Sequence, residues 1–197
     1  PVSRILGRRD FYGRTFRVTP ATLDPRPETE TLIDAAKEIV AAERWGARPL
    51  RLLDIGTGSG AILATLLAEL PSATGLATDI SQGALEVAEA NAHDIGVGNR
   101  AAFRLARSLD GIGGPFDIVV SNPPYIPTAD IASLDRDVAA YDPVEALDGG
   151  RDGLDIYREI AGRWSAVAPD GWVLVEVGAG QASDAAAILA EGARGRV

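Results

Sequence analysis

Two hydrophobic patterns alternate along the chain. Short, nearly continuous apolar runs are followed by longer segments in which apolar residues recur every three or four positions, as in Leu32, Ile33, Ala36, Ile39 and Val40. The longer segments predict amphipathic helices and the short runs predict buried strands. We predict helices over 29–44, 62–70, 82–92, 154–167 and 181–191. We predict strands over 50–55, 73–78, 101–105, 116–120 and 172–177.

This alternation predicts an α/β fold. Strands that alternate with helices form parallel βαβ units, and nearly continuous apolar strands indicate a sheet covered on both faces. We therefore expect a Rossmann-like, doubly wound, mostly parallel sheet. Ligands of such sheets bind beyond the carboxyl ends of the strands, which is where Gly56, Asp79 and Asn122 fall. The connection over 126–152 is expected to lack regular structure.

Composition is that of one globular domain. The chain has 197 residues, and 46% of them are hydrophobic. Its longest apolar segment, 61–70, is interrupted by Glu69 and is too short to cross a bilayer. The N-terminus, which begins Pro1-Val2-Ser3-Arg4, has no signal-peptide core. We expect a cytoplasmic protein that does not associate with membranes.

Charge and residue counts limit which metal sites and binding partners are expected. There is no cysteine and one histidine, His93, so thiolate and multi-histidine zinc sites are excluded and no metal site is expected. We interpret His93, in a predicted helix, as structural. The net charge is −9 and no Lys/Arg-rich run occurs, which argues against direct binding of nucleic acid. We expect a monomer.

A glycine-rich turn follows the first predicted strand of the alternation. It reads Asp54-Ile55-Gly56-Thr57-Gly58-Ser59-Gly60, and Asp79 ends the next strand. Small residues there let backbone approach a ligand at a helix N-terminus, and the Asp79 carboxylate can accept hydrogen bonds from both ribose hydroxyls. This predicts an adenosine-containing cofactor. A tight turn without ligand and a dinucleotide site of an NAD-dependent dehydrogenase are the alternatives. Asp54 favours S-adenosylmethionine, because it suits a positively charged amino-acid end.

The segment Asn122-Pro123-Pro124-Tyr125 directly follows the predicted strand 116–120. The Asn122 side-chain oxygen and a backbone carbonyl of the Pro-Pro pair can each accept one N–H of a planar NH2 group, and the Tyr125 ring can stack on it. Such a grip suits methylation of an amide or exocyclic amine nitrogen. A Pro-rich turn that ends a strand is the alternative.

These motifs together resemble the class I S-adenosylmethionine-dependent methyltransferases that modify amide or exocyclic amino nitrogens. The stretches 19–30 and 142–154 are further similar to the release factor glutamine methyltransferases. The resemblance implies N5-methylation of the glutamine in the Gly-Gly-Gln motif of peptide chain release factors, which would be the protein partners. It also implies a helical domain before a linker over 1–28, a methyltransferase domain over 29–197, and closing strands beyond the last helix.

The resemblance also assigns roles to residues. Asn122, Pro123 and Tyr125 are implied to be catalytic, and with Pro124 they are implied to bind glutamine. The implied cofactor-binding residues are Asp54, Gly56, Thr57, Gly58, Ser59, Gly60, Asp79 and Asn122. Two pairs depart from the family pattern. Leu23-Asp24 replaces two apolar residues, and Ala106-Arg107 replaces an acidic and an aromatic residue that usually meet adenine.

The expected mechanism is direct displacement, in which the glutamine nitrogen attacks the sulfonium methyl without a metal and without a dedicated general base. Orientation and desolvation would supply the catalysis. A nucleic-acid adenine methyltransferase, a ribosomal-protein glutamine methyltransferase and a cofactor-binding domain without activity remain alternatives. The first would need a basic groove, which the sequence does not indicate.

Overall fold

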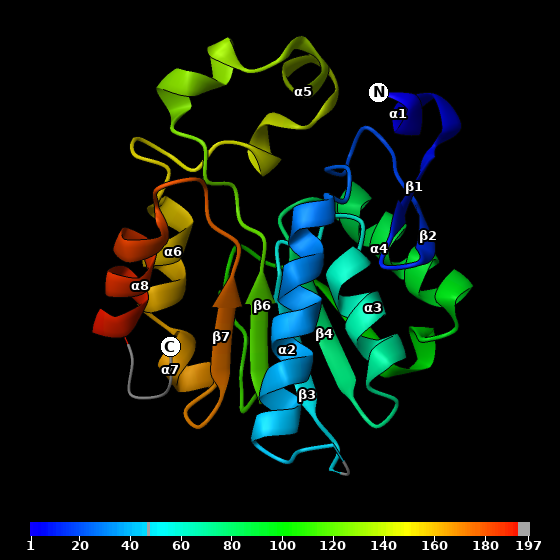
Figure 1. The fold of residues 1–197 in the computed structure, drawn as a ribbon, viewed down its shortest axis with the longest axis vertical. Helices are drawn as coiled ribbons and strands as arrows, with labels where there is room; N and C mark the ends of the chain where they lie inside the picture. The colour runs from blue at the N-terminus through cyan, green and yellow to red at the C-terminus, as the bar shows by residue number, and fades with distance from the viewer. Residues whose placement is uncertain (47, 193–197) are drawn as a thin grey trace.

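A five-stranded parallel sheet forms the centre of the protein. A computed structural model describes residues 1–46 and 48–192. The strands are β3 (Arg51–Ile55), β4 (Thr74–Asp79), β5 (Ala101–Leu105), β6 (Ile118–Ser121) and β7 (Trp172–Val175). Their order in the sheet is β5-β4-β3-β6-β7, and every neighbouring pair is parallel (Figure 1). The predicted doubly wound sheet is confirmed, and its strand order reverses between β3 and β6.

Successive strand residues face two different cores. Leu52, Ile118 and Val120 belong to one buried cluster, whereas Leu53 and Val119 belong to another. This follows from the alternation of side chains along a strand. Helices cover both faces: α2 (Glu30–Ala42), α3 (Ala61–Glu69) and α4 (Gln82–Ile95) contribute to the first cluster, and α6 (Asp155–Ala161), α7 (Trp164–Val167) and α8 (Ala182–Glu191) to the second.

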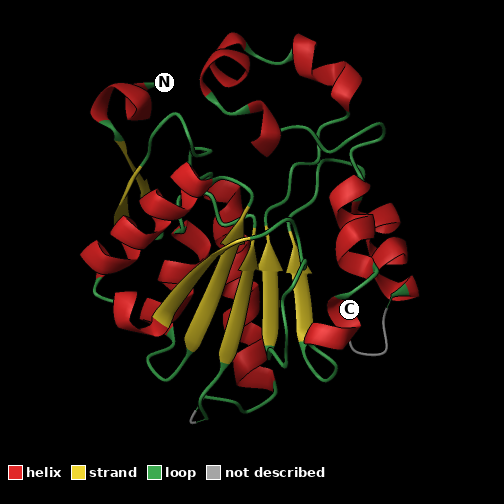
Figure 2. Cartoon of the chain, turned by 180° about the vertical axis from the view of Figure 1, so that it is seen from behind, coloured by secondary structure: helices red, strands yellow, loops and turns green. Residues whose placement is uncertain are grey.

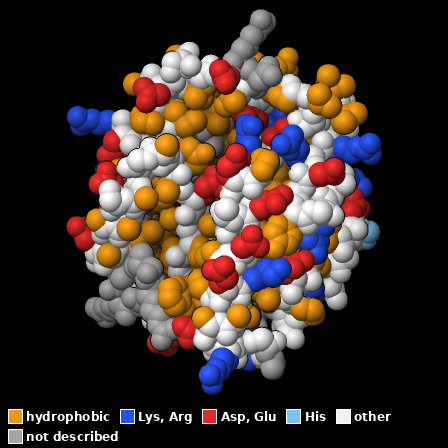
Figure 3. Space-filling view, viewed as in Figure 1, with side chains coloured by type: hydrophobic (Ala, Val, Ile, Leu, Met, Phe, Trp, Pro, Cys, Tyr) orange, Lys and Arg blue, Asp and Glu red, His pale blue; other side chains and the backbone are white. Residues whose placement is uncertain are grey.

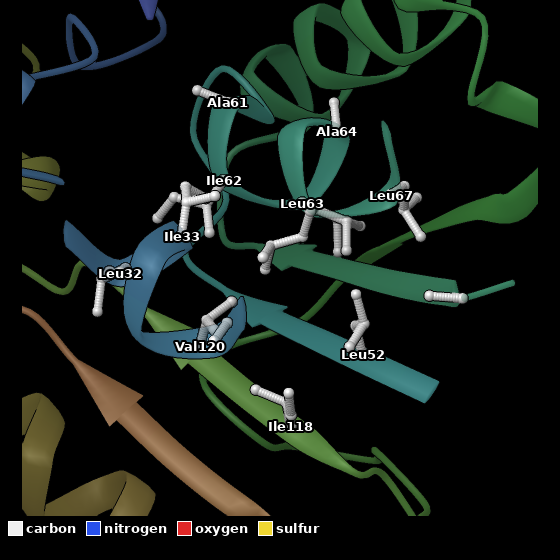
Figure 4. Close-up of a cluster of buried hydrophobic side chains, with 14 of the residues drawn as sticks. Leu32, Ile33, Leu52, Ala61, Ile62, Leu63, Ala64, Leu67, Ile118 and Val120 are labelled. Atoms are coloured by element: carbon white, nitrogen blue, oxygen red, sulfur yellow. The ribbon is translucent and has the colours of Figure 1, made fainter. Parts of the chain in front are cut away.

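The first cluster shows how α2 and α3 pack their apolar residues on the sheet. Leu32 and Ile33 of α2 and Ile62 and Leu63 of α3 converge on the strand residues Leu52, Ile118 and Val120 (Figure 4). Removal of these side chains from water is the main stabilising contribution, about 25 cal/mol per Å² of apolar surface. The apolar residues that recur every three or four positions in the sequence therefore form the buried face of each helix.

The N-terminal segment forms structure that the sequence did not predict. It contains the short helix α1 (Val2–Leu6) and an antiparallel hairpin of β1 (Arg8–Phe11) and β2 (Arg14–Arg17). Phe11 and Phe16 pack edge to face, 6.0 Å between ring centroids, and join the same core as α2 and α3. Asn91 of α4 bonds both backbone groups of Arg17, at 2.8 and 3.0 Å. The β1–β2 hairpin thus contributes two aromatic side chains to the core of the domain.

The connection over 126–152 differs from expectation. It contains the 3-10 helices η3 (Thr128–Ser133) and η4 (Val144–Ala146) and the helix α5 (Arg136–Tyr141), so the prediction of no regular structure was wrong. Short local turns of this kind satisfy backbone groups that no strand pairs with. The remaining 3-10 helices are η1 (Pro27–Thr29) and η2 (Gly98–Arg100). The connection lies above the carboxyl ends of the strands (Figure 2).

The other predicted elements are present with shifted bounds. The predicted helix 154–167 is interrupted between α6 and α7, with Gly162 at the end of α6. Ser81 caps α4, as predicted, and its side chain accepts a hydrogen bond from the Ala84 N–H at 3.2 Å. Within residues 1–46 and 48–192, each helix is too short or too polar to pass through a bilayer.

Candidate active site

The loops after β3, β4 and β6 meet at the carboxyl edge of the sheet and border a cavity of about 820 Å³. This size is within the range typical of small-molecule sites. Most of the predicted site residues line it: Gly56, Thr57, Gly58, Ser59, Asp79, Asn122, Pro123 and Pro124. Asp54 and Tyr125 lie next to these residues in the chain but not in the cavity wall. Gly60 lies behind the turn, against α4.

The turn after β3 adopts a conformation that favours glycine. Gly56, Gly58 and Gly60 have φ angles of +68°, +55° and +78°, in the region that side-chain-bearing residues rarely occupy. A Cβ atom at Gly56 or Gly58 would meet open space. At Gly60 it would lie 2.9 Å from the Ala88 Cβ, so this glycine also lets α4 approach the turn.

Gly60→Ala is therefore expected to destabilise the fold more than Gly58→Ala. Both variants carry the strain of a left-handed alanine, and Gly60→Ala adds a collision with α4, for a total of about 3 kcal/mol against about 1 kcal/mol. Urea unfolding of the two variants beside wild type measures the difference. Equal free energies of unfolding in both variants would contradict the close approach of Ala88.

Asp79 connects the glycine turn to the next loop. Its Oδ2 accepts the Gly58 N–H and its Oδ1 accepts the Ser81 N–H, each at 2.9 Å. A carboxylate oxygen can accept more than one hydrogen bond, so each oxygen keeps acceptor capacity toward the cavity that Asp79 lines. The carboxylate is thus held in place by backbone while it remains able to accept two hydroxyl groups.

Asp54 lies beneath the turn and is fully buried. Its Oδ2 accepts the Thr57 hydroxyl at 2.6 Å. Burial raises the pKa of the Asp54 carboxyl to about 7, although the Thr57 hydrogen bond opposes this shift. Asp54 therefore contacts the cavity through Thr57, and its direct contact with a cofactor stays a prediction.

The raised pKa of Asp54 predicts a pH-dependent stability. The folded protein holds this proton more tightly than the unfolded chain, whose aspartate has a pKa near 3.8, so the contribution of Asp54 to stability declines as pH rises from about 4 to about 7. The decline is about 4 kcal/mol at 1.4 kcal/mol per pKa unit. Asp54→Asn should lack it, so the variant gains stability relative to wild type across that interval. Urea unfolding at pH 4.5 to 8 tests this, and parallel profiles would contradict it.

Asn122 directly follows β6 and is one of the residues that line the cavity. Its Nδ2 donates a hydrogen bond to the Thr29 Oγ1 at 3.0 Å, which leaves Oδ1 as the acceptor end of the carboxamide. Pro123 and Pro124 line the same wall. Tyr125 is half-buried beside them, and burial raises the pKa of its hydroxyl. Stacking of its ring on a substrate stays a prediction.

Glu176 is a half-buried acidic neighbour of Asn122 that the sequence analysis missed. It follows β7, and its N–H donates to the Ser121 carbonyl at 3.0 Å, so it lies beside the start of the Asn122 loop. Burial raises the pKa of its carboxyl, whereas hydrogen bonds with Thr29, Asn122 and Tyr125 lower it. The detectable signal was an acidic residue at the carboxyl end of a predicted strand, the same signal that indicated Asp79.

Comparison with known proteins places this chain in a family. The family described as "Methyltransferase small domain" matches residues 30–135. Release factor glutamine methyltransferase of Rhodospirillum rubrum is 51% identical over 98% of the chain and 58% of that protein. The enzyme of the same name from Cereibacter sphaeroides is 46% identical over 100% of the chain and 68% of that protein. The chain belongs to the release factor glutamine methyltransferase family.

A solved structure is also that of a methyltransferase. Ribosomal protein L11 methylase from Lactobacillus delbrueckii has a TM-score of 0.58 and 26% identity, over 87% of this chain and 73% of that one. These proteins are methyltransferases, which decides against the dehydrogenase interpretation. The chain spans about three fifths to two thirds of the length of the curated relatives that it matches.

In this member of the release factor glutamine methyltransferase family, buried charged side chains link α1 to the connection over 126–152. Arg4 forms ion pairs with Asp24, at 3.4 Å, and with Asp142. Arg26 bonds the other Asp142 oxygen at 2.7 Å. The family departure at Leu23-Asp24 therefore has a structural role, because Asp24 is paired with Arg4 and the Ser3 hydroxyl. This network holds the connection over 126–152 against α1.

The second departure, at Ala106-Arg107, also lines the cavity. The Arg107 guanidinium is held by two hydrogen bonds to the Glu159 Oε1, at 2.6 and 3.1 Å. This ion pair keeps the cationic group oriented along the wall that follows β5.

The surface charges are mixed. Acidic and basic side chains are interspersed over the face drawn in Figure 3, without a continuous basic area. The His93 side chain is 88% exposed, in agreement with its interpretation as a structural surface residue. In the part of the chain that the structure describes, no group of three His, Asp or Glu side chains is arranged to hold a metal ion.

Proposed function

We propose that this chain transfers a methyl group from S-adenosylmethionine to the side-chain nitrogen of the glutamine in the Gly-Gly-Gln motif of peptide chain release factors. Two relatives at about half identity bear the name of this activity. The observation that carries the proposal is the position of Asn122. Asn122 lines the cavity that the glycine turn also lines, and its side-chain nitrogen is bound to Thr29.

The residues present fit S-adenosylmethionine. Asp79 has acceptor capacity for the two ribose hydroxyls, and the left-handed turn at Gly56 and Gly58 leaves open space where other residues would carry a side chain. Ala106 and Arg107 border the part of the cavity next to Asp79, where the adenine would lie. When bound, S-adenosylmethionine would supply its sulfonium methyl group: the glutamine nitrogen would bond to the methyl carbon as the carbon–sulfur bond breaks in line, S-adenosylhomocysteine would leave, and one N–H proton would pass to solvent.

The protein's own contribution to catalysis would be orientation. An amide nitrogen is a poor nucleophile because its lone pair is delocalised. The Asn122 Oδ1 and the Pro123 carbonyl would accept the two N–H bonds of the glutamine and aim the nitrogen, an effect that can supply about 7 to 11 kcal/mol. As the nitrogen gains positive charge, its N–H groups become stronger donors, so these acceptors bind the transition state more strongly than the ground state. No dedicated base is required for this step.

Mass spectrometry of a release factor incubated with the chain and S-adenosylmethionine tests the proposal. The expected result is a gain of one methyl group on the Gly-Gly-Gln glutamine, absent from a release factor that carries alanine at that position. A bacterial ribosomal-protein mixture and an adenine-containing oligonucleotide are incubated in parallel. Methylation of either one, with the release factor unmodified, would refute the proposed substrate.

A further inference from the structure

The Asn122 carboxamide has two chemically opposite ends. Its oxygen accepts hydrogen bonds and its NH2 group only donates them. If the carboxamide were turned by 180°, its own NH2 would face the glutamine NH2, and two donor groups cannot form a hydrogen bond with each other. The proposed function therefore requires that something in the protein keeps the oxygen toward the substrate.

The partner of the Asn122 nitrogen is a hydroxyl with no competing local role. Thr29 occupies the N-cap position of α2, where a threonine side chain ordinarily accepts a backbone N–H, yet it makes no such capping bond. Its Oγ1 instead accepts from Asn122, 93 residues away in the chain, at 3.0 Å. Thr29 is 4% exposed, so the contact is shielded from bulk water.

A hydroxyl can donate as well as accept, so Thr29 alone does not determine the direction of the bond. Glu176 would supply the direction. Hydrogen bonds with Thr29 and Asn122 lower the pKa of its carboxyl, and its Oε2 is buried with no hydrogen-bond partner among the described residues. When ionised, this carboxylate can only accept hydrogen bonds. If the Thr29 hydroxyl donates its hydrogen to Glu176, the lone pairs of the Thr29 oxygen remain free to accept from Asn122. Both Thr29 and Glu176 are then acceptors, so Asn122 can contact either of them only through its NH2 group.

We propose that Thr29 and Glu176 are positioning residues, which together fix the Asn122 carboxamide with Oδ1 toward the substrate nitrogen. This inference rests on the proposed function and deepens it, because it names residues from the start of α2 and the end of β7 that act through Asn122. Neither needs to touch substrate. The Glu176 backbone is itself anchored, since its carbonyl accepts the Tyr157 hydroxyl at 2.8 Å.

Three variants test the role by kinetics. Thr29→Val removes the hydroxyl at nearly constant volume and Glu176→Gln introduces a donor, and each is expected to lower kcat by about 10- to 100-fold, as loss of an interaction used in the transition state does. The KM for the release factor and the Kd for the cofactor should change less than about threefold. Thr29→Ser keeps the hydroxyl and should restore turnover to near wild type.

Thr65→Val is the matched control, because Thr65 is fully buried in α3 and its hydroxyl has no hydrogen-bond partner among the described residues. It should leave kcat unchanged. Wild-type kcat in Thr29→Val, or equal losses in Thr29→Val and Thr29→Ser, would overturn the inference.

A second measurement needs no methyl transfer. The side-chain NH2 signal of Asn122 in a nitrogen-15 NMR spectrum, assigned by its loss in Asn122→Ala, should move in Thr29→Val and Glu176→Gln and stay in place in Thr29→Ser. If wild type fails to methylate the release factor, the proposed function fails, while this signal still decides the orientation of Asn122. A signal that is unmoved in both Thr29→Val and Glu176→Gln overturns the inference.

Discussion

Asn122→Ala is expected to lower kcat by about 10³-fold, the loss found when one preorganised hydrogen-bonding group of a transition state is removed. The reason is that Oδ1 of Asn122 would be the acceptor for the substrate NH2 in the proposed mechanism, since Nδ2 is bound to Thr29. The Kd of S-adenosylmethionine should rise less than about tenfold, because Asp79 and the glycine turn remain. Single-turnover kinetics with a release factor and calorimetry with the cofactor measure the two quantities.

Asn99→Ala is the control for this experiment. Asn99 is an exposed asparagine in η2, just before β5 begins, at the edge of the sheet opposite the cavity. Its replacement should leave both kcat and cofactor Kd at wild-type values. Near-normal turnover in Asn122→Ala would show that the carboxamide does not orient the nucleophile, and the proposed mechanism would then be wrong.

Asp79→Ala is expected to raise the Kd of S-adenosylmethionine by at least about 100-fold, because two effects combine. The variant loses the acceptor of the ribose hydroxyls, and it also frees the Gly58 and Ser81 N–H groups that the carboxylate holds at 2.9 Å. Hydrogen bonds to a charged group contribute about 1.5 to 3 kcal/mol each. Calorimetric titration with S-adenosylmethionine and with S-adenosylhomocysteine measures the loss.

Asp79→Ala should mainly change the Kd of the cofactor, and Asn122→Ala should mainly change kcat. At saturating cofactor, Asp79→Ala should keep kcat within about tenfold of wild type, whereas Asn122→Ala stays slow at any cofactor concentration. Asp184→Ala, which removes an exposed carboxylate in the first turn of α8, is the control and should bind the cofactor normally. Unchanged cofactor affinity in Asp79→Ala would contradict the assignment of Asp79 to the ribose.

Sequence reasoning predicted residues that line one cavity because parallel strands end at one edge of the sheet. Gly56, Asp79 and Asn122 each follow a predicted strand, and the register of β3, β4 and β6 brings their loops around one cavity. Hydrophobic spacing is a local property, so it identified all five strands of the sheet. It missed the β1–β2 hairpin, whose two strands of four residues carry little periodic signal.

The contacts that complete the site join residues far apart in the chain. Thr29 meets Asn122 across 93 positions and Arg4 meets Asp142 across 138. No local pattern specifies such a pair, because each partner is by itself an ordinary polar residue. The interaction appears only when the ends of α1, α2, β6 and β7 are packed together.

The sequence by itself determined the parallel α/β sheet, the glycine turn, Asp79 and the Asn-Pro-Pro-Tyr segment, because periodicity and turn chemistry act within a few residues. Only the tertiary structure decided that Asp54 lies buried beneath the turn, that Thr29 binds the Asn122 nitrogen, and that Glu176 joins them. Burial and hydrogen-bond direction depend on which surfaces meet after the chain has folded. In the mechanism that we propose, those two properties would orient the acceptor of a strand-end asparagine.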